Sequence, residues 1–153
     1  MPDPLYPALL EAYDGAIKRF AIDLGELTHD ELNRSYGESC RKAYDFVYEV
    51  STLHRRAAKE LNGEPTPFPW KMGEEWPQAP AEMCDKQAAA EFFRVTAQEL
   101  HDAFEAHRDE PLCNGEGPTP LYKNLRFGVG HCSYHDAQLN FIQAMRGDMA
   151  VHW

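Results

Sequence analysis

The sequence predicts an all-α protein, specifically a four-helix bundle, from three observations. Four long segments have apolar residues at the spacing of one helix face, and none shows the alternation of a strand. Residues that start and stop helices flank these segments. Two of the connections are long, as in several bundle topologies. The 153 residues are enough for one domain with a sizeable core, so we expect a single domain over 1–153.

The first helix is expected from about Leu5 to Leu27, with Pro7 tolerated in its first turn. A polar connection, from Thr28 to Glu38, should follow it. Apolar residues recur near the helical period along this segment: Leu9, Leu10, Tyr13, Ile17, Phe20, Ile22 and Leu24.

The second helix is expected from Ser39 to Asn62, with Ser39 as N-cap and Gly63 just past its end. Its apolar stripe contains Ala43, Phe46, Val47, Val50, Leu53, Ala57 and Leu61.

The connection from Glu64 to Cys84 contains five prolines, two tryptophans and Phe68. So many prolines exclude a helix, and so many aromatic residues are unusual for a solvated linker. We therefore expect a long ordered connection packed over the body between the second and third long helices. It either covers one end of the core or acts as a lid, since connections of this length often have a role.

The third helix should start after the capping residue Asp85 and end near Arg108. A turn region rich in glycine and proline, Pro111 to Pro118, follows it. The fourth helix should begin at Thr119 and Pro120, a capping residue followed by proline at the first helical position. It should end near Arg146, where Gly147 stops it.

The composition excludes some classes of binding partner. The formal net charge is -10 and the pI is about 5.1, which argues against nucleic acid or an anionic membrane as the main partner. No apolar run approaches the ~20 residues of a membrane span, and the first residues lack the pattern of a signal peptide. We therefore expect a cytoplasmic protein whose four cysteines are mostly free thiols.

The fourth helix carries the most informative pattern, His131 and His135 four residues apart. Positions i and i+4 share one helix face, so both imidazoles can bind one metal ion. Phe127, Gly128 and Ile142 fall on the same stripe, which places the histidines inward. Inward histidines are costly unless they are paired or bind a metal. The alternative is two core histidines bonded to backbone or carboxylate groups.

Glu49 and His54, both in the second helix, are the candidates for a third ligand. Glu49 lies at the edge of the apolar stripe, where an unpaired carboxylate is costly. Its alternative role is a salt bridge with Arg56 or another base. His54 lies toward the polar flank beside Arg55, so we expect it to be exposed or at a helix interface.

These residues resemble the DinB/YfiT-like superfamily of metal-dependent four-helix bundles, whose second helix carries a metal-binding histidine and whose fourth carries HxxxH. His131 and His135 match the fourth-helix ligands, and Gln138 matches the glutamine that follows them. Glu49 stands where the second-helix histidine is expected. Lys42 stands where that family commonly has serine or threonine.

The resemblance implies a divalent metal ion held by Glu49, His131 and His135. Two histidines and one carboxylate can hold Zn²⁺, Ni²⁺, Mn²⁺ or Fe²⁺ and leave positions open for water or substrate. Gln138 would act as a second-layer group or a substrate contact. Tyr48 either lines the site or packs.

The resemblance also implies a small-molecule substrate, a low-molecular-weight thiol among the candidates, and activity as a thiol S-transferase or a hydrolase. A non-catalytic metal- or ligand-binding bundle stays open. So does a metal-free interaction protein in which the three side chains form a buried hydrogen-bonded cluster.

Four further expectations concern single residues and assembly. Cys132 should be core filler, and Asp136 should be an exposed helix residue. Trp153, at the end of the short tail, should dock on the body. The family resemblance and the apolar surface of Trp70, Trp76 and Trp153 favour a homodimer.

Overall fold

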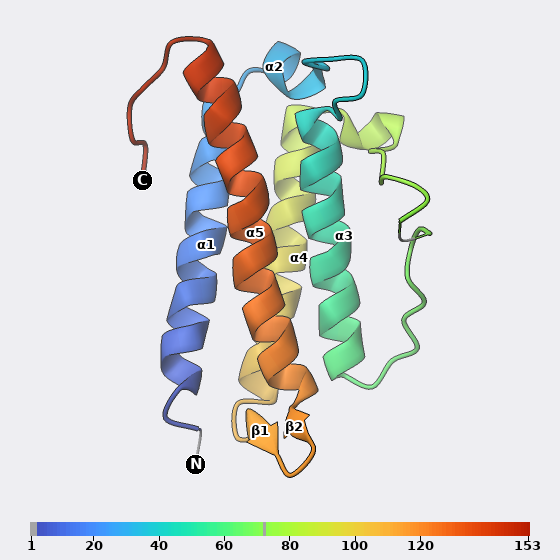
Figure 1. The fold of residues 1–153 in the computed structure, drawn as a ribbon, viewed down its shortest axis with the longest axis vertical. Coiled ribbons are helices and arrows are strands. Elements are labelled where there is room, and N and C mark those ends of the chain that lie inside the picture. Colours follow the sequence, from blue (N-terminus) through green and yellow to red (C-terminus); the bar gives the residue numbers. More distant parts are fainter. Residues whose placement is uncertain (1–2, 72) are drawn as a thin grey trace.

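A computed structural model describes residues 3–71 and 73–153, which are mostly helical (Figure 1). The predicted all-α class is therefore confirmed. The four long helices are α1 (Tyr6–Glu26), α3 (Ala43–Leu61), α4 (Lys86–Ala106) and α5 (Pro120–Met145). The short elements are α2 (His29–Asn33), the 3-10 helix η1 (Ala81–Met83), and the antiparallel strands β1 (Cys113–Asn114) and β2 (Gly117–Pro118).

The four long helices lie side by side around one core (Figure 1). The main packing pairs are α1 with α5 and α3 with α4, and the α3–α5 and α1–α4 seams complete the arrangement. Apolar side chains fill the centre, because each helix turns one stripe inward. The largest fully buried ones include Tyr13, Tyr44, Phe20, Phe93, Phe104 and Leu100.

Three of the four predicted helices have the expected limits within one or two residues, because their caps are local. The Asp85 carboxylate accepts from the Ala88 N–H at 2.9 Å, and the Thr119 side chain caps α5. The prediction for Ser39 is wrong, since α3 begins four residues later with Lys42 as N-cap. Asp45 provides the acceptor there: it takes the Lys42 N–H at 3.0 Å.

The expected polar connection contains the short helix α2. Thr28 and Glu31 form a reciprocal capping box at its start, and Leu32 is fully buried beneath it. The turn region before α5 contains the β1–β2 hairpin, whose strands are two residues each. Both elements are too short to give a periodic signal.

The described residues of the connection from Glu64 to Cys84, 64–71 and 73–84, are non-helical apart from η1, as predicted, and run alongside α3 (Figure 1). Two kinds of contact attach it to the body. The Ala79 N–H donates to Asp45 at 2.8 Å. Trp76 lies over the Arg41 guanidinium, with 4.7 Å between the ring centroid and Cζ. The segment therefore packs against the start of α3 through the same loop that carries Arg41.

The prediction that Asp136 is exposed is wrong, because α5 packs against α1 as well as α3 and buries two faces. Asp136 is buried beside Asp23 of α1. Burial, together with hydrogen bonding to Asp23, raises the pKa of Asp136 to about 7. Asn140 and the Trp153 indole donate to Asp23 at 2.6 and 3.1 Å. The tail thus docks through Trp153, as expected.

Cys132 is buried as expected, with its thiol 3.6 Å from the Ala16 carbonyl oxygen. All four cysteines are free thiols. Among the described residues no helix has both the length and the apolar character to cross a membrane.

The close approach of α1 and α5 depends on Gly128. A Cβ there would lie 2.9 Å from Cε2 of the buried Tyr13 ring. We predict that Gly128→Ala lowers the free energy of unfolding by about 1–3 kcal/mol, because the ring must shift in a packed core. Chemical denaturation followed by circular dichroism measures the change.

Gly130→Ala is the matched control on the same helix, because its Cβ would meet nothing within 4 Å. It should stabilise the protein by up to ~1 kcal/mol through helix propensity. Equal effects of the two substitutions would contradict the packing argument.

Candidate metal centre

Glu49, His131 and His135 meet at the seam between α3 and α5. One potential ligand atom from each residue lies within 4.8 Å of the others. His131 Nε2 is 3.3 Å from Glu49 Oε1, and His135 Nε2 is 3.6 Å from Glu49 Oε2. The histidines come from successive turns of α5, as the spacing predicted, and packing of α5 on α3 brings Glu49 to them.

Gln138 lies one turn beyond His135 and fixes its ring. The His135 Nδ1–H donates to Gln138 Oε1 at 2.6 Å. This bond places the proton on Nδ1 and leaves the Nε2 lone pair directed at Glu49, the arrangement in which a second-layer group prepares a histidine for a metal. Aromatic rings hold both histidines in place: Phe46 stacks on His135, and Phe127 stacks on His131.

The donor set and its spacing fit a divalent metal ion. Ligand atoms ~2.1 Å from one ion are about 3.0–3.4 Å apart in common geometries, close to the two distances to Glu49. His135 Nε2 is buried without a hydrogen-bond partner. A buried nitrogen without a partner costs free energy, and coordination would remove that cost.

Arg41, in the loop before α3, also contacts the cluster. Its guanidinium donates to Glu49 Oε2, and the two side chains are only 15% and 12% exposed. Burial favours the neutral form of Glu49, but contacts from His131, His135 and Arg41 outweigh burial and hold its pKa well below the ordinary range. Burial, opposed by Glu49, lowers the pKa of His135. The carboxylate is therefore ionised and the imidazole neutral, as metal ligands must be.

The alternative partner expected for Glu49, Arg56, pairs instead with Glu60 at 3.2 Å. The other alternative, a salt bridge between Glu49 and another base, is confirmed, and the base is Arg41. The sequence did not single out Arg41 for this role, because the predicted helix from Ser39 included it, whereas α3 starts at Ala43 and leaves Arg41 in the loop. Tyr48 contacts Phe92 of α4 and borders a hollow with Trp70 and Trp76. None of its described contacts reaches the three ligands.

Of the two positions expected for His54, exposed or at a helix interface, the second is confirmed, but the side chain is fully buried there and does not lie on a polar flank. Its ring lies against Tyr13 of α1 and Phe93 of α4. The reason is that α3 packs on several helices, so its buried surface is wider than the apolar stripe. Burial, with a smaller contribution from His131, lowers the pKa of His54 to about 3. Neither ring nitrogen has a hydrogen-bond partner.

Two hollows adjoin the cluster from different sides. One, of about 240 Å³, has Glu49 in its wall and Trp70, Trp76 and Pro77 around it. The other, of about 540 Å³, lies over α5 and contains His131 with Lys123 and Arg126 at its border. The long connection therefore forms part of the surroundings of Glu49, although Trp76 itself is 73% exposed.

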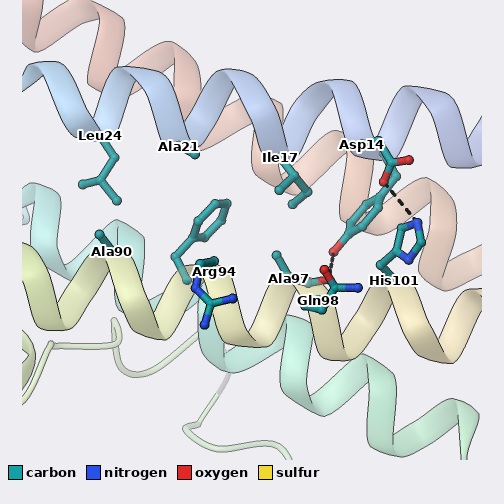
Figure 2. Close-up of a pocket in the computed structure, with 11 residues that line it drawn as sticks. Asp14, Ile17, Ala21, Leu24, Ala90, Arg94, Ala97, Gln98 and His101 are labelled. Carbon is teal, nitrogen blue, oxygen red and sulfur yellow. Dashed lines mark hydrogen bonds and ion pairs between the residues drawn. The ribbon is translucent and has the colours of Figure 1, made fainter.

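A third hollow, of about 370 Å³, lies between α1 and α4 (Figure 2). Its lining is mostly apolar, and the pair Asp14–His101 stands at one end, with 3.6 Å between carboxylate and imidazole. None of the three candidate ligands lines it. The hollow is thus separate from the α3–α5 seam.

Comparisons with known proteins identify no relative. No family model matches the chain, and neither a curated protein nor a solved structure gives a significant match. The arguments for function therefore depend on the residues and their geometry.

The buried state of His54 predicts acid-dependent stability. The folded pKa of His54, about 3, lies below the unfolded value of ~6.5, so the unfolded state binds more protons between these values. The contribution of His54 is complete above pH ~6.5 and is lost as the pH falls toward 3, with a slope of at most ~1.4 kcal/mol per pH unit.

We predict that His54→Leu removes this part of the pH dependence. It should also raise the free energy of unfolding at pH 7 by about 1 kcal/mol, because two unpartnered nitrogens leave the core. Urea denaturation at several pH values, for wild type and variant, measures both effects. An unchanged pH dependence would show that His54 is not buried as a neutral group.

Proposed function

We propose that the protein binds one divalent metal ion through Glu49, His131 and His135, and that it is a DinB-like four-helix bundle. The observation that carries the proposal is the convergence of one carboxylate from α3 and two imidazoles from α5. Glu49 and His131 meet there although they are 82 residues apart in sequence. The buried Nε2 of His135, which has no hydrogen-bond partner, also supports metal binding. Zn²⁺, Ni²⁺, Mn²⁺ and Fe²⁺ all accept such a ligand set.

We propose that a small molecule reacts at this centre by thiol transfer or hydrolysis. A divalent ion with open positions can activate water or bind a thiolate. The residues of the chain prepare the centre: Gln138 orients His135, and Phe46 and Phe127 limit the motion of the imidazoles. Hollows on two sides of the cluster give room for a small substrate.

A metal-free structural cluster is the competing function, and two contacts of Glu49 favour it. Arg41 already compensates the charge of Glu49, and His131 Nε2 lies 3.3 Å from the same carboxylate. A carboxylate with these partners needs no metal for its charge balance. Homodimer formation stays a prediction, which light scattering tests.

The metal proposal predicts a clear pattern among variants. Untagged wild type should contain or take up one equivalent of Zn²⁺, Ni²⁺ or Mn²⁺, measured by elemental analysis and titration. His135→Ala and Glu49→Gln should reduce binding to background, since two ligands seldom retain an ion. His54→Leu, which changes a buried histidine outside the triad, should keep full binding.

Two results would contradict this pattern. If the His54 variant lost metal while the Glu49 variant kept it, the third ligand would be His54. If wild type took up none of the three ions, the metal-free cluster would be the correct description. A panel of thiols and electrophiles then tests turnover in the loaded protein.

A further inference from the structure

Among the described residues, Arg41 is the one arginine or lysine that pairs with a candidate ligand, Glu49, and aromatic rings hold it in place. Its guanidinium binds Glu49 Oε2. The Phe46 and Trp76 rings lie 5.0 and 4.7 Å from its Cζ, distances at which aromatic faces stabilise a cation. A guanidinium held in this way is poised to bind an anion.

The net charge of the cluster depends on whether a metal ion is bound. Glu49 and Arg41 alone neutralise each other. When Glu49 also binds a divalent cation, the partly buried cluster gains two uncompensated positive charges, and such charges are costly away from water. An anion that contacts both the open metal position and Arg41 would remove much of this cost.

The surroundings limit the size of that anion. The hollow beside Glu49 has a volume of about 240 Å³ and includes Trp76, the residue that covers Arg41. Arg41 also borders a second hollow of about 380 Å³, again shared with Trp76. These volumes suit a small molecule.

Most other charged groups near these hollows lie at the surface; the exception, Asp45, is buried and already accepts the N–H groups of Lys42 and Ala79. Glu74 and Glu75 line the smaller hollow but are exposed, and Glu74 pairs with Lys71 at 3.7 Å. Glu38, Lys42 and Asp45 border the larger one. Charges in water are screened, whereas Arg41 is only 15% exposed. Arg41 should therefore dominate ligand choice.

We propose that Arg41 is the specificity residue of the centre, and that the substrate or ligand carries a small anionic group such as a carboxylate. When Glu49 binds the metal ion, the Arg41 guanidinium leaves the Glu49 carboxylate and binds this anionic group instead. The inference rests on the proposed metal function. It has a thermodynamic consequence: metal and anion must strengthen each other's binding by the same factor.

Acetate is the probe, and acetamide is its neutral counterpart. In wild type, saturating acetate should lower the zinc Kd by about 10-fold, within the usual range of coupling, while acetamide should leave it unchanged. Isothermal titration in a metal buffer that fixes free Zn²⁺ measures the Kd. Nickel gives an independent repeat.

Arg41→Gln should abolish the acetate effect. Without acetate it should bind zinc at least as tightly as wild type, because no guanidinium competes for Glu49. Loss of a merely structural arginine would instead weaken zinc binding. Should Arg41→Gln fail to fold by circular dichroism, Arg41→Lys, which keeps the charge but lacks the planar fork, should show a reduced acetate effect.

Arg55→Gln is the matched control. Arg55 has the same kinds of contact, an ion pair with Glu99 and a ring, Phe92, at 5.1 Å, but it does not touch the cluster. This variant should keep the full acetate effect.

The outcomes separate the two proposals. Zinc binding with an equal acetate effect in wild type and Arg41→Gln, or with none in wild type, overturns the role of Arg41 and leaves the metal centre intact. No zinc binding in wild type, with or without acetate, overturns both.

Discussion

A carboxylate at the seam of two helices is the constraint on which this structure depends. Glu49 is mostly buried and ionised, and an ionised carboxylate away from water requires compensation. The Arg41 guanidinium from the preceding loop supplies the opposite charge, and Nε2 atoms of His131 and His135 from α5 lie 3.3 and 3.6 Å from the carboxylate. The position of α5 against α3, the loop before α3 and the packing of Trp76 on that loop are all tied to this one charge.

The helix α5 carries a second buried polar group on its other side. Asp136 faces Asp23 of α1, one residue away from the imidazole of His135. The helix α5 is polar at buried positions on both sides because it packs against both α1 and α3, although His135 Nε2 and Asp136 Oδ1 stay without a hydrogen-bond partner. The tail residue Trp153 completes the second cluster by donating to Asp23.

The long connection from Glu64 to Cys84 contacts the same charged cluster through Trp76. Its prolines prevent a helix, so the chain can run beside α3 and place Trp76 over Arg41. Through this contact the segment stabilises the guanidinium that balances Glu49. The connection therefore packs beside the Arg41–Glu49 pair.

The sequence by itself determined the features that local chemistry controls. Caps at Asp85 and Thr119 and the apolar stripes place the long helices, and the HxxxH spacing places two imidazoles on one face. The position of Glu49 at the edge of a stripe, together with the resemblance that places a second-helix ligand there, selected it as a partner for them.

Tertiary packing decided the features that the sequence did not predict. His54 and Asp136 were predicted on polar faces, but each lies where its helix meets a further neighbour and is buried. Arg41 reaches Glu49 from a loop without any periodic signal. The start of α3 depends on Asp45, which also binds Ala79. The burial of His54 and Asp136 comes from helices distant in sequence, and no local pattern reports such contacts. The Arg41–Glu49 and Lys42–Asp45 contacts are short in sequence, but they form where α3 starts at Ala43 and not at Ser39.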